Sequence, residues 1–521
     1  MYSLLQDPFI RVTLTGGEPR LMTLPEIYAA FLKDEVESFP GLRPHQRAGW
    51  HMLLAQLGAI ATYRSGTSLK TAKAWREALT RIAPAPAWDL IGEEDAAPAF
   101  LQPPMSAPYR EGRRIRAADM LDILVTARNH AIKAGQATSA GPDSWLFALV
   151  TLQTMQGFSG NLLYGISRMN KGLGNRPFVG LAPSGGVGAH VMRDIRMMIA
   201  AREGVLKRTG LSEEGHDLLW TLPWDGSKAL RFASLAPWYV EICRRVRLRR
   251  DVIGIFADTE TSTCPRVDAE GLNGLTGDHW APTMLKEQKL YTADGRGLNA
   301  NVACDLLFPQ DGVRRYETPD ALRLLPGEKD MRVVMRVLVR GQGKTEGYHE
   351  REIPFRRAAL SLLQTEAGTL RLAEMAREHL AELAEISSAI RYGMIGFCAG
   401  GDRKAMQKPS KELAAQADHL SAKLRAAFLK GADPAFFDRV QDRLEAPGAE
   451  IGQLRELIGE ARALFLPTLL SLPVSSPRRL KAQIAGERAF EVAVRFGRGR
   501  IGSLRDQIFP PRVTQDEKET A

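Results

Sequence analysis

One long loop, rich in glycine, asparagine and basic residues, has the composition of a nucleic-acid contact. It runs from Gln156 to Pro177 with the sequence QGFSGNLLYGISRMNKGLGNRP. Its glycines allow close backbone approach, which the narrow minor groove of DNA requires. Tyr164, Arg168, Lys171 and Arg176 supply stacking and polar groups. The same spacing also fits a loop with a purely structural role, and both interpretations stay open.

Two further segments combine basic residues with turn signals. Residues 126–145, TARNHAIKAGQATSAGPDSW, contain Arg128, Asn129 and Lys133 with no acidic residue before Asp143. A solvated connection is the alternative for this segment. Residues 331–357 predict a β-hairpin with a basic tip at Gln342-Gly-Lys-Thr345. Such a tip can be pushed between base pairs, or it can belong to an ordinary edge hairpin that its charges keep soluble.

The end of the chain is basic. Glu487, Glu491 and Asp506 are outnumbered there by Arg478, Arg479, Lys481, Arg488, Arg495, Arg498, Arg500 and Arg505. A helix with this balance can follow a phosphate backbone. A charged, solvent-facing helix surface is the alternative.

Catalytic signatures are nearly absent. The sequence has no GxxxxGK[ST], HExxH or GxSxG motif. The doublet His216-Asp217 resembles the adjacent ligands of metal nucleases, but such sites need several more ligands and no second cluster accompanies it. A metal-dependent nuclease therefore remains only the alternative function. Four separated cysteines without a CxxC pair predict reduced thiols and no zinc site, and we expect neither a metal nor a cofactor.

The helices and strands that position these segments are predicted to differ between the first and the last part of the chain. The 521 residues are 44% hydrophobic and 25% charged, with a net charge of +10, which excludes bulk disorder. Residues 46–64 and 144–156 predict core helices. Apolar spacing predicts long helices at 358–397, 411–430, 450–467 and 477–495. We therefore expect an α+β protein: an irregular mixed α/β domain over 1–360 and an all-α four-helix bundle over 361–521. We expect no signal peptide and a cytoplasmic location.

Several blocks together resemble one known family. They include LLQDPFIRV, FPGLRPHQRAGWHMLLAQL, DSWLFALVTLQTMQGFSG, YGISRMNKGLGNRPFVGL, LLWTLPWDG, TGDHWAP and VLVRGQGKTEGYHEREIP. In this order and spacing they resemble the CasA family, the large subunit of the type I-E Cascade complex of CRISPR immunity. The resemblance implies a non-enzymatic subunit that checks target double-stranded DNA for a protospacer-adjacent motif (PAM). It also implies crRNA, the other Cascade subunits and a helicase–nuclease as partners.

The resemblance also implies roles for particular residues. The family's glycine loop falls on Gly157, Phe158, Ser159, Gly160 and Asn161, and its hairpin wedge on Gln342, Lys344 and Thr345. Arg128, Asn129 and Lys133 correspond to the loop that docks against crRNA and a neighbouring subunit. Two departures stand out: Asn273 lies where family members often have a PAM-reading lysine, and of a possible zinc-binding cysteine cluster only Cys264 remains.

Overall fold

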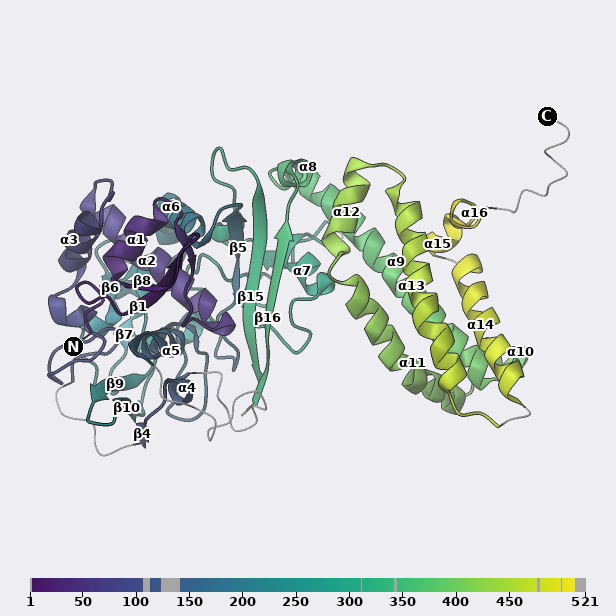
Figure 1. Ribbon diagram of the computed structural model, residues 1–521, viewed down its shortest axis with the longest axis horizontal. Coiled ribbons are helices and arrows are strands. Elements are labelled where there is room, and N and C mark those ends of the chain that lie inside the picture. Colours follow the sequence, from purple (N-terminus) through teal and green to yellow (C-terminus); the bar gives the residue numbers. More distant parts are fainter. Residues whose placement is uncertain are drawn as a thin grey trace. The chain divides into compact units, whose positions relative to one another are not determined.

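The computed structural model describes residues 2–105, 113–122, 141–310, 312–341, 344–475, 478–497 and 499–510, and it divides the chain into two units (Figure 1). Unit 1 contains 1–298, 305–307 and 313–355, and unit 2 contains 299–304, 308–312 and 356–521. Unit 1 mixes helices with strands, whereas unit 2 is helical. The predicted α+β class is therefore confirmed.

The strands of unit 1 form several small sheets instead of one large sheet. Their orders are β2-β1-β3, β4-β10-β9, β11-β7, β13-β12-β14, β16-β15-β5 and β6-β8. The bounds are β1 Ile10–Leu14, β2 Arg20–Met22, β3 Val36–Ser38, β4 Arg113–Ile115, β5 Phe178–Pro183, β6 His216–Leu218, β7 Leu230–Arg231, β8 Leu235–Val240, β9 Arg245–Arg250, β10 Ile255–Glu260, β11 Val267–Asp268, β12 Thr283–Met284, β13 Lys289–Leu290, β14 Tyr316–Glu317, β15 Met331–Gly341 and β16 Lys344–Pro354.

The helices of unit 1 enclose its main core. They are α1 Leu24–Phe31, α2 Arg47–Ser65, α3 Ala72–Ile82, α4 Ala118–Leu121, α5 Pro142–Met155 and α6 Val187–Thr209, while α7, Ala300–Leu307, is divided between the units. Helix α2 is apolar around most of its circumference and is buried accordingly. It ends at Gly66, whose left-handed backbone is typical of a helix C-cap. Helices α2 and α5 confirm the two predicted core helices.

A long hairpin forms one edge of unit 1 beside β5 (Figure 1). Strands β15 and β16 pair antiparallel, with a register shift between Val339 and Arg340. On its other side β15 pairs with β5, from Met331 opposite Pro183 to Arg336 opposite Phe178. Because β5 directly follows the glycine-rich segment, this pairing fixes the start of the hairpin relative to that segment. The predicted hairpin is thus confirmed.

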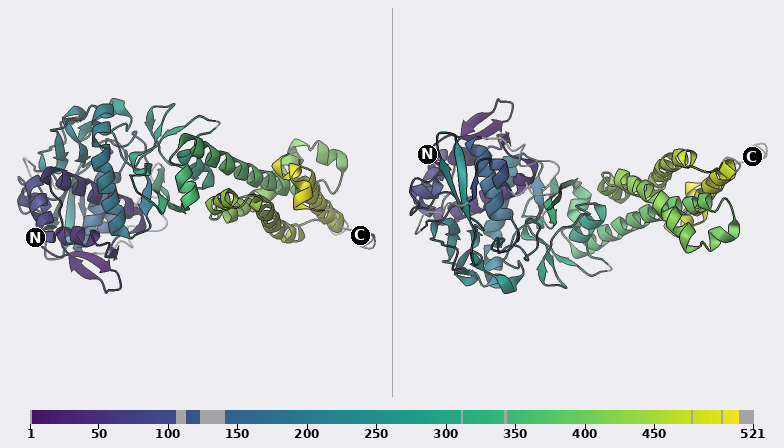
Figure 2. Two further views of the ribbon diagram at one scale, coloured as in Figure 1. Left: turned by 90° about the horizontal axis from the view of Figure 1, so that it is seen from above. Right: turned by 90° about the horizontal axis from the view of Figure 1, so that it is seen from below.

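The elements of unit 2 that the structure describes are helices joined by connections, as Figure 2 shows from two further sides. Its long helix α9 packs against α14, α11 and α13. The bounds are α8 Arg357–Leu362, α9 Glu366–Cys398, α10 Arg403–Gln407, α11 Lys411–Ala432, α12 Phe436–Glu445, α13 Ala449–Ser471, α14 Arg479–Phe496, α15 Arg500–Ser503 and α16 Arg505–Ile508. Thr365 and Ser410 cap α9 and α11 through their side-chain oxygens.

Two details of unit 2 differ from the expectation. No helix is predicted between 431 and 449, but the helix α12 begins at Phe436 and buries Phe436 and Phe437. Pro467 was expected to end a helix, but α13 continues through it to Ser471. A proline inside a helix removes one backbone hydrogen bond and often ends the helix. Here Phe465 and Leu469 are buried, and their packing keeps the last turn helical.

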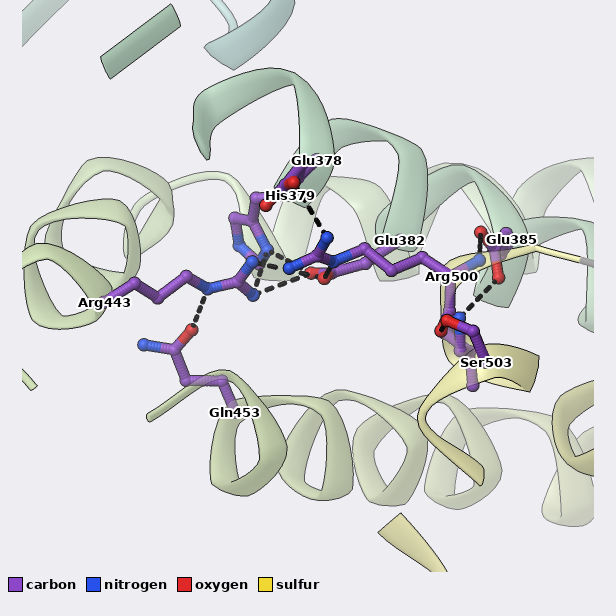
Figure 3. Close-up of polar contacts among 9 residues, drawn as sticks. Glu378, His379, Glu382, Glu385, Arg443, Gln453, Arg500 and Ser503 are labelled. Atoms are coloured by element: carbon purple, nitrogen blue, oxygen red, sulfur yellow. Dashed lines mark hydrogen bonds and ion pairs between the residues drawn. The ribbon is translucent and has the colours of Figure 1, made fainter. Parts of the chain in front are cut away.

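A buried polar network joins four helices of unit 2 (Figure 3). Glu382 of α9 accepts hydrogen bonds from Arg443 of α12, at 2.7 Å, and from Arg500 of α15, at 2.8 Å. Arg443 in turn donates to Gln453 of α13 at 2.7 Å. Burial alone would raise the pKa of Glu382, but the bonds from His379 and Arg443 outweigh it and lower that pKa. Buried charged side chains need oppositely charged, hydrogen-bonded partners of this kind.

Candidate nucleic-acid interface

The glycine-rich loop folds back on itself through backbone hydrogen bonds. The N–H of Gly157 donates to the carbonyl of Gly174 at 3.2 Å, and the N–H of Phe158 donates to that of Gly172 at 3.0 Å. A Cβ added to Gly157 would lie 2.3 Å from the Gly172 oxygen and 2.4 Å from the Gly174 oxygen. Gly157 is therefore required for the loop's own packing.

The exposed turn of this loop has a different character. The N–H of Leu163 donates to the carbonyl of Gly160 at 3.0 Å, which closes the turn. Gly160 has a φ of 151°, and nothing lies within 4 Å of a Cβ placed there. Ser159 and Asn161 on either side are exposed. The turn thus presents open backbone to an approaching molecule.

Buried groups hold the loop from beneath. The N–H of Ser167 donates to Glu241 at 2.8 Å, and the Ser167 hydroxyl donates to the same carboxylate at 2.6 Å. The Ser167 hydroxyl also contacts the Tyr239 hydroxyl at 2.7 Å. Burial raises the pKa of Glu241 to about 7 despite these hydrogen bonds. Glu241, next to β8, therefore anchors a loop that lies more than 70 residues away in sequence.

Two basic residues predicted to contact a ligand are structural instead. Arg176 is buried and bonded to Asp278 at 2.5 Å. Arg168 is also buried, with its guanidinium carbon 4.0 Å from the centre of the Tyr239 ring. A large loop inside a folded unit needs satisfied internal anchors, and these arginines provide them. Their predicted role as ligand contacts is wrong.

Lys171 is exposed and connects the glycine loop to the segment around Asn273. Its ammonium pairs with Glu270, and Asn170 donates to the carbonyl of Leu290 at 2.7 Å. Asn273 is exposed, with a left-handed backbone (φ 49°) and its carbonyl bonded to the N–H of Leu290. The basic residue beside the Asn273 segment is thus Lys171. The contact between Lys171 and Glu270 joins residues 99 positions apart, so no local sequence pattern indicates it.

A hollow of about 410 Å³ lies between these two segments. Its lining includes the aromatic residues Phe158 and Tyr164 and the paired residues Lys171 and Glu270. The remaining lining is mostly apolar, with Gly165, Ile166, Ser167, Met169, Pro265, Val267 and Ala269. The Tyr164 hydroxyl donates to the carbonyl of Thr263 at 3.0 Å, which fixes that ring. The two segments therefore form one continuous surface.

The hairpin tip and the docking loop are only partly described. The backbone of β16 begins at Lys344, while the side chains of Lys344 and Thr345, together with Gln342, lie outside the described residues. Arg128, Asn129 and Lys133 also lie outside them. The part of the hairpin near its tip reaches the glycine loop, because the N–H of Asn175 donates to the carbonyl of Leu338 at 3.4 Å.

The His216-Asp217 doublet does not form a ligand pair. His216 is exposed, whereas Asp217 is buried and paired with Arg64. Successive residues of a strand point to opposite faces, so the two side chains of β6 diverge. Burial raises the pKa of Asp217, and Arg64 supplies the positive charge beside its carboxylate.

Among the described residues, one cluster has the composition of a metal site: His51, His190 and Asp194, all buried. Asp194 already accepts hydrogen bonds from His51 and from Trp280, both at 2.8 Å, and from Arg193 at 3.1 Å. Burial alone would raise the pKa of Asp194, but the His51 hydrogen bond and nearby positive charge lower it. The carboxylate is thus satisfied by donors within the core. The prediction of no bound metal stays a prediction.

Solved structures resemble this chain over nearly its whole length. Cse1 from Acidimicrobium ferrooxidans matches with a TM-score of 0.64 at 14% identity, over 98% of this chain and 99% of that chain. CasA (Cse1) from Thermus thermophilus matches with a TM-score of 0.60 at 16% identity, over 94% and 98%. The chain has the CasA fold. A structure described as a CRISPR RNA-guided surveillance complex contains a chain that matches this one with a TM-score of 0.54 at 13% identity, over 94% of this chain and 99% of that chain.

The sequence comparisons add no further relative. No protein-family model and no curated protein sequence matches this CasA-like chain. Within the part of the chain that the structure describes, no helix combines the length and apolar character needed to cross a membrane.

Proposed function

We propose that this chain is the large, non-catalytic subunit of a type I-E Cascade complex. It checks target double-stranded DNA for a PAM through the minor groove, starts duplex opening with its hairpin and helps to recruit the helicase–nuclease. An N-terminal domain (1–360) carries the sensing elements, and a C-terminal four-helix bundle (361–521) completes it. The observation that carries the proposal is the open backbone at Gly160, in a loop whose Lys171 reaches the Asn273 segment, in a chain with the CasA fold.

The geometry of the two segments supports minor-groove contact. The narrow groove admits backbone and small side chains best, and the Gly160 turn offers both. The contact residues are Phe158, Ser159, Gly160, Asn161 and Asn273, while Gly157 shapes the loop through its internal packing. Lys171 supplies the basic side chain beside Asn273, exchanging its ion pair with Glu270 for a contact with the DNA. Exposed ion pairs are weak enough for such an exchange.

The nuclease alternative is tested separately. His216 and Asp217 point apart in β6, which argues against shared metal ligation. Incubating the purified chain with labelled duplex and Mg²⁺ or Mn²⁺ should leave the DNA intact. Cleavage that disappears in His216→Ala would establish the alternative and overturn the non-catalytic role.

A single substitution tests the Gly160 assignment. Gly160→Asp places a carboxylate against the acceptor-rich minor groove and its phosphates, so PAM-dependent binding by the assembled complex should be lost. Gly254→Asp is the matched control, because Gly254 has a φ of 144° and equally open surroundings on a different hairpin. Equal binding by both variants would contradict the assignment.

A further inference from the structure

Two arginines near the hairpin tip have buried nitrogen atoms without a hydrogen-bond partner. Arg340 is the last residue but one of β15, where it lies opposite Thr345. Its Nε and Nη1 are buried and have no partner among the residues that the structure describes. The same holds for the Nη2 of Arg244, which directly precedes β9 and is only 7% exposed. Buried donors without partners are rare in folded proteins, so each needs an explanation.

The two guanidinium groups lie near each other. Burial lowers the pKa of Arg340, and the positive charge of Arg244 lowers it further. The backbone of Arg244 is fixed by Gln153, which accepts from its N–H at 2.8 Å and donates to its carbonyl at 2.9 Å. The register of the hairpin shifts directly before Arg340, and such an irregularity re-aims the side chains next to it. The fold thus holds two like charges together at this point.

The carboxylate next to Arg340 is already engaged by other side chains. Asp122 lies close enough to raise the pKa of Arg340. Its two oxygens, however, contact the His45 ring at 2.8 Å and accept from the Gln46 amide at 2.5 Å. Two guanidinium groups therefore face one carboxylate that other donors hold, which leaves net positive charge here. Buried charge of this kind is unfavourable until an anion joins it.

The chemistry and the place of these groups favour a phosphate. A guanidinium presents its N–H donors in a planar fork that matches the oxygens of a phosphate. The three unpaired nitrogens can hold two oxygens of one such group. The site also lies between the two elements proposed to contact duplex DNA. Asn175, at the end of the glycine loop, bonds to Leu338, and Arg340 lies two residues farther toward the hairpin tip.

We propose that Arg244 and Arg340 form a phosphate-binding site that holds the backbone of one separated DNA strand beside the hairpin tip. This inference rests on the proposed function and deepens it, because it names what the chain binds after the duplex opens. Phosphates recur at every nucleotide, so a strand separated at the tip brings one to this site. Phosphate contacts carry no sequence information, and the site therefore hinders re-pairing without choosing the PAM.

The first test uses the free chain. Arg340→Met removes the charge and keeps an unbranched stem, so the melting midpoint should stay the same or rise, since an unpaired buried charge is costly. Arg336→Met is the matched control in the same strand. Arg336 pairs with Glu350 at 2.5 Å and Glu352 at 3.5 Å, so this variant should melt at a lower temperature. A lower midpoint for Arg340→Met than for Arg336→Met would show that Arg340 has a structural role and would overturn the inference.

The second test measures target binding by the assembled complex. Single phosphates of the target duplex are replaced by uncharged methylphosphonates, one at a time, along the first nucleotides after the PAM on each strand. The wild type should lose about tenfold in affinity at one linkage of one strand. Arg340→Met and Arg244→Met should each show this loss with unmodified DNA and lose nothing further at that linkage. Arg336→Met should bind like the wild type throughout.

The outcomes separate this inference from the proposed function. A wild-type complex that binds target duplex without PAM preference overturns both. PAM-dependent binding in which no linkage is coupled to Arg340 overturns the phosphate site alone. Coupling to a linkage of the crRNA would assign the site to the guide, and impaired assembly of Arg340→Met with the other subunits would assign it to an acidic protein segment. Either result overturns the inference.

Discussion

At the scale of single residues, glycines within one loop have different physical roles. Gly157 packs between the carbonyls of Gly172 and Gly174, while Gly160 faces open space. Only the second is therefore available to a ligand. The loop's arginines divide similarly, since Arg168 and Arg176 are internal and Lys171 is exposed.

Gly157→Ala is predicted to destabilise unit 1 by about 1–3 kcal/mol, because backbone carbonyls cannot yield to the added methyl group. All eight tryptophans lie between Trp50 and Trp280, so urea denaturation followed by tryptophan fluorescence reports on this unit. Gly271→Ala is the control: its added Cβ meets nothing within 4 Å, and it should change stability by less than about 0.5 kcal/mol. Equal stability of the two variants would contradict the packing role.

The raised pKa of Glu241 predicts a pH dependence of stability. A folded-state pKa of about 7, above the ordinary value of 4.5, means that the folded chain binds the extra proton. The contribution of protonated Glu241 to the free energy of unfolding is fully present below about pH 4.5. It is lost as the pH rises through about 7. The wild type should lose about 3 kcal/mol relative to Glu241→Gln between these limits, measured by denaturation at several pH values. If the free energy of unfolding changed with pH in the same way for the wild type and for Glu241→Gln, Glu241 would not bind the extra proton in the folded state.

At the scale of elements, the hairpin is a rigid extension of the β5 sheet. Arg336 is the last β15 residue paired with β5, and β15 continues to Gly341. At about 3.4 Å per residue, the paired strands extend roughly 17 Å beyond that point. Val337, Leu338 and Val339 beyond that point are buried, so the unit holds the hairpin close to its tip, and the hairpin can resist being bent back by a duplex.

Replacing residues 342–346 by a two-residue turn should therefore abolish strand separation next to the PAM. The remaining hairpin keeps its pairing with β5, so the fold should be unchanged. The measurement is the fluorescence of 2-aminopurine placed at the first base pairs of the target, in the assembled complex. Unchanged unwinding by the shortened variant would rule out a wedge function.

Sequence patterns predicted the elements of this chain better than its contacts. Helices α2, α5 and α9 and the β15–β16 hairpin follow from apolar periodicity and turn residues. Helix α12 and the continuation of α13 through Pro467 do not, because tertiary burial overrode the local helix-breaking signal. The Ser167–Glu241 and Lys171–Glu270 contacts join segments far apart in sequence, so no local pattern encodes them.

At the scale of the whole molecule, the net charge of +10 overstates the charge available to a polyanion. Arg176, Arg193, Arg247 and Arg266 are among the most deeply buried side chains, so part of the basic content stabilises the interior. The proposed function requires only a short DNA contact from this chain, with its partners supplying most of the binding energy.

The central claim is that this chain confers PAM dependence on a crRNA-guided complex. The most direct measurement compares target-duplex binding by the complex with and without this chain, over a library of duplexes in which the bases flanking the target are randomised. We predict a strong preference for particular flanking bases only when the chain is present, with affinity falling as salt increases. The same preference profile with and without the chain would contradict the account.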